Sequence, residues 1–245
     1  ISPHDNETVY AGSQHLHRTR NGGQSWEVIS PDLTRNDVSK QQKSGGLTTE
    51  DVSPNYFSVL FAIAESPLEE GLIWTGSNDG LVQLTRDGGA TWTDVTSNIP
   101  DLPEWGTVNN VEPSRFDPAV AYVTFDFHQL GNNDPYVYRT DDYGESWQSI
   151  AGDVPRSVFS YARVVREDPS RPGLLYLGTE NAIYVSLDDG EGWMPLQGDL
   201  PHAPVYWLEV QPHFNDLVVA TYGRGFWILD DITPIQQLRD EVLAT

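Results

Sequence analysis

The chain has 245 residues, 38% of them hydrophobic, which is enough to bury a sizeable core. It carries 36 acidic residues against 14 basic ones, and a formal net charge of −22 argues against binding to nucleic acid or to anionic membrane surfaces. The absence of cysteine excludes disulfides, thiolate metal sites and a cysteine nucleophile. No apolar run approaches the ~20 residues of a membrane-spanning helix.

The chain opens with ISPHDNETVY, which has neither an initiator methionine nor the basic and apolar regions of a signal peptide. We therefore expect a mature chain or a piece of a longer one. Two short apolar segments joined by a small turn follow, within VYAGSQHLHRTR, and they predict a pair of antiparallel strands.

A short phrase with the pattern [ST]-x-[DN]-x-G-x-x-W follows this strand pair and recurs three more times. The Asn or Asp side chain is suited to accept backbone N–H bonds of a turn, the glycine supplies a positive φ, and the indole is expected to fold over the turn. We therefore expect these residues to serve the fold. The four copies are Thr19, Asn21, Gly23 and Trp26; Thr85, Asp87, Gly89 and Trp92; Thr140, Asp142, Gly144 and Trp147; and Ser186, Asp188, Gly190 and Trp193.

Each phrase belongs to a unit of four predicted strands, A to D, with the phrase between strands C and D. Repeated four-stranded units predict an all-β fold, a β-propeller of antiparallel blades. The first unit lacks strand A, and the fifth has strands A to C with a short possible fourth strand in residues 232–238. The expected domain is 1–235, with blades at 1–37, 57–99, 106–153, 160–199 and 204–235, followed by a C-terminal tail at 236–245.

The four phrases resemble the Asp-box, or BNR repeat, of sialidases, propeller glycoside hydrolases and sortilin-type propellers. The segments GSNDGLVQLTRDGGATW and ATYGRGFWILDD are most similar to bacterial sortilin-like proteins that are often labelled glycosyl hydrolases. The resemblance implies a propeller and leaves activity open, because one fold hosts many functions. We expect about five blades of a larger ring; a closed five-bladed ring is the alternative.

Candidate ligand-binding residues lie in the turns between strands B and C and in the connectors between blades, which a propeller gathers around its central channel. Arg224 stands between two glycines in TYGRGFW, so its guanidinium is expected to project toward a carboxylate or a planar ligand. Its alternative role is a salt bridge to a neighbouring blade. The other candidates are Tyr222, Asn78, Asn181, His15, His128 and Trp105.

Catalysis of glycoside hydrolysis needs two carboxylates close together. The B–C turns supply Asp79, Asp134 and Glu180 as weak candidates, each of which is equally suited to capping a turn. His15 and His17 share a strand face but lack a third ligand, so no metal site and no cofactor are expected.

Two functions remain open. The first is a non-catalytic, sortilin-like binding propeller that recognises a peptide, protein or glycan through its channel face. The alternative is an extracellular glycoside hydrolase that acts on a polysaccharide with two of the B–C turn carboxylates. Both imply an extracellular or periplasmic bacterial protein, no nucleic-acid partner, no membrane span and, if the chain is a fragment, contact with the remainder of the propeller.

Overall fold

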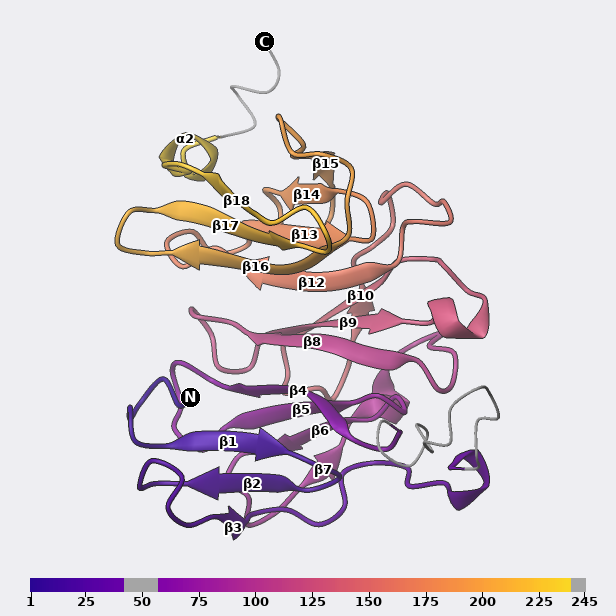
Figure 1. The fold of residues 1–245 in the computed structure, drawn as a ribbon, viewed down its shortest axis with the longest axis vertical. Coiled ribbons are helices and arrows are strands. Elements are labelled where there is room, and N and C mark those ends of the chain that lie inside the picture. Colours follow the sequence, from indigo (N-terminus) through magenta and orange to yellow (C-terminus); the bar gives the residue numbers. More distant parts are fainter. Residues whose placement is uncertain (42–56, 239–245) are drawn as a thin grey trace.

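The computed structural model describes residues 1–41 and 57–238. Part of the long connector between the first two blades, and residues 239–245 of the expected tail, lie outside the described residues. Five antiparallel sheets of three or four strands follow one another along the chain (Figure 1). The predicted all-β propeller fold is confirmed.

The sheets have the following strands. The first contains β1 (Val9–Gly12), β2 (Leu16–Thr19) and β3 (Glu27–Val28), and the second β4 (Leu60–Glu65), β5 (Ile73–Ser77), β6 (Val82–Thr85) and β7 (Thr93–Asp94). The third contains β8 (Thr107–Pro113), β9 (Ala121–Asp126), β10 (Tyr136–Thr140) and β11 (Gln148–Ser149), and the fourth β12 (Ala162–Glu167), β13 (Leu175–Thr179), β14 (Ile183–Ser186) and β15 (Met194–Pro195). The fifth contains β16 (Val205–Gln211), β17 (Asp216–Thr221) and β18 (Phe226–Leu229). Short helices are η1 (Val38–Lys40), η2 (Thr96–Asn98), η3 (His128–Leu130) and α2 (Thr233–Gln236).

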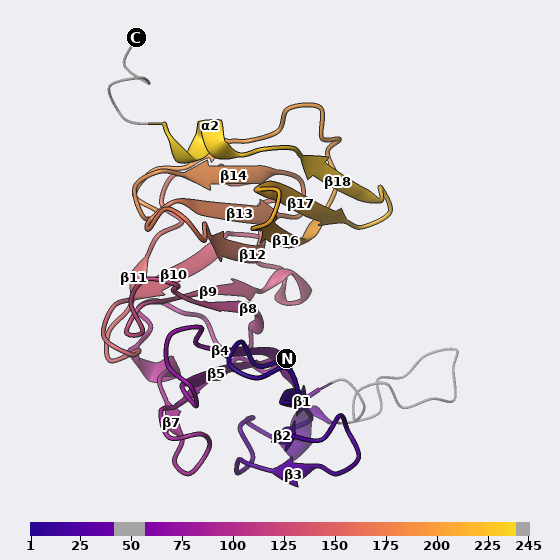
Figure 2. The same cartoon turned by 90° about the vertical axis from the view of Figure 1, so that its left-hand side faces the viewer.

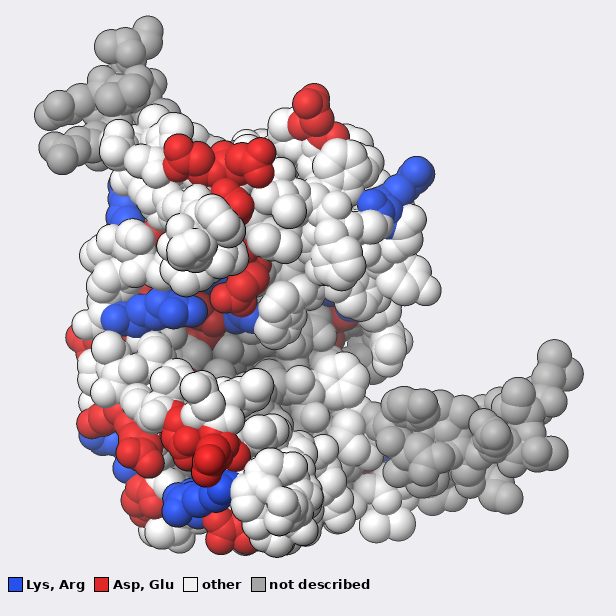
Figure 3. Space-filling view, turned by 60° about the vertical axis from the view of Figure 1, so that its left-hand side comes forward, with Lys and Arg blue, Asp and Glu red and all other residues white. Residues whose placement is uncertain are grey.

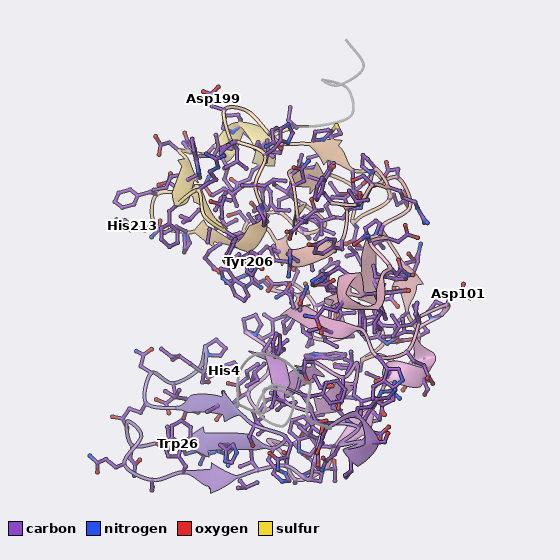
Figure 4. All side chains as sticks on the ribbon, turned by 45° about the vertical axis from the view of Figure 1, so that its right-hand side comes forward. His4, Trp26, Asp101, Asp199, Tyr206 and His213 are labelled. Atoms are coloured by element: carbon purple, nitrogen blue, oxygen red, sulfur yellow. The ribbon has the colours of Figure 1, made fainter. Side chains whose placement is uncertain are left out.

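The sheets stack as successive blades around an open arc (Figure 2). Strands β4, β8, β12 and β16 are the innermost strands of their blades, and each of the first three packs on the inner strand of the next blade. The first and fifth blades lie on either side of a gap, so the described residues form a partial propeller rather than a closed five-bladed ring (Figure 4).

The two ends of each blade have different partners. The B–C turn bonds to the incoming connector, as in Glu180 N–H to Tyr161 O, 3.2 Å, and Tyr222 N–H to Pro204 O, 2.9 Å. The phrase between strands C and D bonds instead to the A–B turn, as in Asp189 N–H to Gly173 O, 2.8 Å. The B–C turns and the repeated phrases therefore lie on opposite faces.

Every inner strand carries the same irregularity. The register against the second strand slips by one residue in each of the four blades that have an inner strand. A bulge leaves one residue unpaired and re-aims its side chain. The four extra residues, at equivalent places near the B–C end, are Phe61, Asn109, Arg163 and Tyr206.

The repeated phrase, which we call the lock, is held by three hydrogen bonds. In the fourth blade Ser186 Oγ donates to Asp188 Oδ1 over 2.7 Å and accepts the N–H of Gly190 over 2.8 Å. The same carboxylate oxygen accepts the N–H of Gly192 over 2.9 Å. The other three copies repeat this pattern, with Asn21 in place of aspartate in the first.

Three of the four lock tryptophans reach beyond their own turns, to the preceding blade. The Trp92 indole donates to Ile29 O over 3.1 Å, and the Trp193 indole donates to Ile150 O over 2.6 Å. Trp147 packs in the core of the second blade, edge-on to Trp74 at 5.9 Å. The lock thus joins two blades as well as closing a turn.

The fifth blade ends differently from the expectation of a short fourth strand. Residues 232–238 contain helix α2, and Ile232 stands where the fourth blade has Asp189, since its N–H bonds to Asn215 O as that of Asp189 bonds to Gly173 O. Ile232 is buried, and both Ile232 and Ile235 pack in the core between the fourth and fifth blades. A helical turn anchored by these two side chains therefore replaces the lock.

The tryptophan contacts generate a stability prediction. Trp193 is 6% exposed whereas Trp26 is 47% exposed, because the described chain has no blade before the first. Trp193→Ala is expected to lower the free energy of unfolding by about 3–5 kcal/mol through cavity formation. Trp26→Ala is expected to lower it by less than about 1 kcal/mol. Urea unfolding measures both, and equal losses would contradict the packing described.

A second prediction concerns Asp87. Hydrogen bonds from Thr91 and Thr85 lower the pKa of the Asp87 carboxyl to about 2. A carboxyl with a lowered folded-state pKa stabilises the fold above its unfolded pKa, about 3.9, and loses this contribution as the pH falls toward 2. Asp87→Asn, which copies the first lock, is expected to show a smaller fall in Tm between pH 4 and pH 2. Parallel Tm curves for the two proteins would refute this.

Candidate functional site

A ladder of stacked side chains crosses the B–C face from the third blade to the fifth. His128 of η3 stacks on Tyr161 at 4.8 Å, and the Arg163 guanidinium lies 4.8 Å from Tyr161 and 4.5 Å from Tyr206. Tyr206 stacks in turn on Tyr222 at 5.5 Å. Two members, Arg163 and Tyr206, are bulge residues, and Figure 4 shows Tyr206 on the inner side of the arc.

The centre of the ladder is charged and mostly enclosed. Arg163, with 12% of its side chain exposed, forms ion pairs with Glu180 over 2.8 Å and with Asp126 over 3.3 Å. Burial lowers the pKa of Arg163, but the two carboxylates outweigh burial and the net shift is upward. Asp126 also bonds His128 Nδ1 at 2.7 Å. Burial and Glu180 together raise the pKa of Tyr161 to about 12, so its hydroxyl stays protonated.

The two ends of the ladder are open. Tyr222 is 71% exposed and Tyr206 is 46% exposed, whereas a third of the His128 side chain is accessible. The ladder therefore offers aromatic faces to a ligand above a fixed ionic centre. Exposed tyrosine faces beside carboxylates and a guanidinium suit both the side chains of a polypeptide and the rings of a sugar.

A second charged group lies three residues further along β12. Arg166 contacts Glu112 of β8 closely, lies 3.8 Å from Glu209 of β16, and stacks over Trp207 at 4.2 Å. Burial raises the pKa of Glu112, against the effect of Arg166. Like Arg163, Arg166 links three blades through carboxylates and an aromatic ring. These blades are therefore joined at two positions along β12.

Four carboxylates thus surround two guanidinium groups on the inner wall, in keeping with the acidic chain. Figure 3 shows one face of the molecule, where acidic side chains predominate on both sides of a central hollow. Within residues 1–41 and 57–238, no group of three or more His, Asp or Glu side chains is placed to hold a metal ion. No helix of the described part is long and apolar enough to cross a membrane.

The three carboxylates singled out from the sequence do not meet. Asp79 is fully buried and accepts bonds from Ser77 Oγ and the Arg35 N–H, so it braces its own turn. Asp134 forms an exposed ion pair with Arg156. Glu180 alone belongs to the ladder, where it binds Arg163.

Three of the other candidates, Asn78, Asn181 and His15, lie in the B–C turns of three different blades. Asn78 accepts the Val59 N–H with its side chain, and Asn181 accepts a bond from His202 with its main chain. His15 lies in the B–C turn of the first blade, where its N–H bonds to the Ser13 hydroxyl.

Trp105 sits in a connector with φ +71°, a left-handed conformation that is unusual for a bulky residue. Its ring stacks on Phe57 at 6.1 Å and receives the cations of Arg35 and Lys40 at 4.9 and 5.4 Å. The chain's own side chains therefore engage this ring, which lies on the B–C side apart from the ladder.

The remaining candidates lie at the ladder. Tyr222 and His128 are its two ends. Arg224, two residues after Tyr222 in the same B–C turn, is exposed, and its carbonyl accepts the Trp227 indole N–H over 3.0 Å.

Sequence reasoning did not assign the middle of the ladder. The unassigned residues are Asp126, Tyr161, Arg163 and Tyr206. An alignment of the four inner strands, LFA, VNN, ARV and VYW, contains the signal, because its central position is the bulge residue in every blade.

The sequence and the fold of the chain were compared with those of known proteins. No family model matches the chain. It is 31% identical to the vacuolar protein sorting/targeting protein 10 of Laccaria bicolor over 111 residues, 45% of this chain and 7% of that protein. It is 26% identical to the dispase autolysis-inducing protein of Streptomyces mobaraensis over 138 residues, 50% of this chain and 34% of that protein.

Among solved structures, the GH74 xyloglucanase of Xanthomonas campestris has a TM-score of 0.65 and 18% identity, covering 95% of this chain and 36% of that one. The chain therefore spans about a third or less of these relatives. The fold, the locks and the matches define the class, an Asp-box or BNR-repeat β-propeller. Within that class the chain is related to the Vps10/sortilin propellers, and it shares its fold with the GH74 enzymes.

The ionic centre generates a prediction. Arg163→Met removes the partner of two carboxylates in a poorly accessible place, and breaking such a pair costs about 3–5 kcal/mol. Arg156→Met breaks a pair whose side chains are 64% and 43% exposed, so its effect is expected to stay below about 1 kcal/mol. Chemical unfolding of both variants tests this, and equal effects would contradict the assigned role of Arg163.

Proposed function

We propose that the chain is a non-catalytic, sortilin-like binding module that takes a peptide, protein or glycan ligand on its channel face. The observation that carries the proposal is the ladder, whose exposed Tyr206 and Tyr222 rings stand above an ion-paired Arg163. Its rigid centre keeps these rings in place, so little conformational entropy is lost on binding. The similarity to a protein named for vacuolar protein sorting supports a polypeptide ligand.

Hydrolysis of a polysaccharide is the second candidate function. Asp126 and Glu180 come from neighbouring blades, and both reach the guanidinium of Arg163, so the channel face does hold two carboxylates near each other. The shared fold with a xyloglucanase supports a polysaccharide ligand. In either case we propose that the protein works outside the cytoplasm, as the resemblance implies.

The test compares binding of the wild-type chain and of Tyr222→Ala to peptide and glycan arrays, followed by titration of the ligands found. Loss of the ring is expected to weaken binding at least tenfold, because hot-spot aromatics at an interface carry about 2 kcal/mol or more. Phe214→Ala is the matched control, since Phe214 is 68% exposed in the A–B turn on the opposite face.

Two outcomes would overturn the binding proposal. One is ligand binding that Tyr222→Ala leaves unchanged. The other is release of reducing ends from a polysaccharide by the wild type that Glu180→Gln abolishes, which would establish hydrolysis in its place.

A further inference from the structure

A groove of about 230 Å³ lies between β18 and the connector that leaves the fourth blade. Figure 4 shows Asp199, which lines the groove, at the tip of the arc and Tyr206 on its inner side, so the groove is separate from the ladder. Its lining is mainly apolar and includes Ile183, Leu196, Leu200, Val219, Trp227 and Leu229.

The equivalent position in the interface between the third and fourth blades is occupied, and it shows which groups bind there. Between the third and fourth blades, Trp193 donates its indole N–H to Ile150 O and its backbone N–H to the carboxylate of Asp153 over 3.1 Å. The following residues form β15, which pairs with β14 opposite Tyr184 and Val185. One short segment, Trp193 and the strand β15 that follows it, therefore supplies the indole, the backbone N–H and the outer strand.

The groove presents the same acceptors. The segment IAGDVP at 150–155 aligns with LQGDLP at 196–201, so Leu196 corresponds to Ile150 and Asp199 to Asp153. The N–H of Leu196 bonds to Ile183 O as that of Ile150 bonds to Val137 O, which confirms the register. Within the described residues neither the Leu196 carbonyl nor the Asp199 carboxylate has a hydrogen-bond partner.

The edge strand beside the groove is also available. β18 pairs only with β17 among the described residues, and all four of its side chains are exposed, Phe226 by 80% and Ile228 by 59%. A free, apolar edge strand is a ready template for strand addition.

We propose that the groove and the free edge of β18 together form a docking site for an extended, tryptophan-bearing segment of a partner polypeptide. The segment adds as a fourth strand opposite Trp227 and Ile228, the positions that correspond to Tyr184 and Val185. Its indole fills the groove and donates to Leu196 O, and its backbone N–H donates to Asp199.

Two features select this occupant. A folded blade does not fit, because β17 and β18 already take the places of its second and third strands. Helix α2, the last described element, does not line the groove, and the Arg171 guanidinium binds the carbonyls of Ile235, Gln236 and Leu238 at its end.

The probe is a fluorescently labelled peptide with the sequence of residues 186–196, SLDDGEGWMPL. Fluorescence anisotropy is expected to show saturable binding, at least tenfold weaker when the peptide carries alanine for tryptophan. Asp199→Asn in the protein is expected to weaken binding several-fold, and Leu200→Trp, which fills the groove, to abolish it. Leu130→Ala, an exposed leucine of η3, is the control and is expected to bind as the wild type does.

The proposal is overturned if the peptide does not bind, or if its alanine form binds equally well. It is also overturned if hydrogen exchange finds that the β18 amides that point away from β17 are protected in the free protein, because the edge is then covered by another part of the same polypeptide or by a second copy. Sedimentation analysis distinguishes these two cases. None of these outcomes depends on Tyr222, so the result is independent of the function proposed for the ladder.

Discussion

The contact between a lock tryptophan and the main chain of the preceding blade is the interaction on which the arc depends. An isolated four-stranded blade has two faces to cover, and each lock covers part of its neighbour with a large apolar ring. In two of three cases the indole N–H also satisfies a carbonyl of the outgoing connector. The glycine of the lock permits this approach, since a Cβ on Gly190 would come within 2.8 Å of Ile150. Contacts of the outer strands therefore hold neighbouring blades together, so the side chains of the inner strands can serve in ligand binding.

That inner wall is braced by charge. Arg163 and Arg166 lie on one strand, and each joins a carboxylate of the third blade to an aromatic ring of the fifth. Their charges are balanced locally, so the arginines act as struts. The aromatic rings stacked on them are held by the same contacts but keep part of their surface in solvent. The result is a rigid aromatic surface, with ion-paired residues at its centre and solvent-exposed rings at its edge.

The features that could be predicted from the sequence are those formed by residues close together along the chain. The locks and their four-strand units follow from turn chemistry within eight residues, which is why the fold could be inferred. The end of the fifth blade was predicted less well, because the side chains of Ile232 and Ile235 hold helix α2 through packing and belong to no turn motif. At the candidate site, His128, Glu180 and Tyr222 were found because they stand in turns. Arg163 and Tyr206 were not assigned, because their orientation depends on a bulge and their contacts cross from blade to blade.

The repeated bulge has an evolutionary consequence. A bulge residue is unpaired in the sheet, so it can be exchanged without disturbing the strand register. In this one chain the four positions already hold a phenylalanine, an asparagine, an arginine and a tyrosine on nearly the same backbone. Each of these four blades thus contributes one variable position to a shared rim, and recognition can diversify by single substitutions while the strand register stays constant.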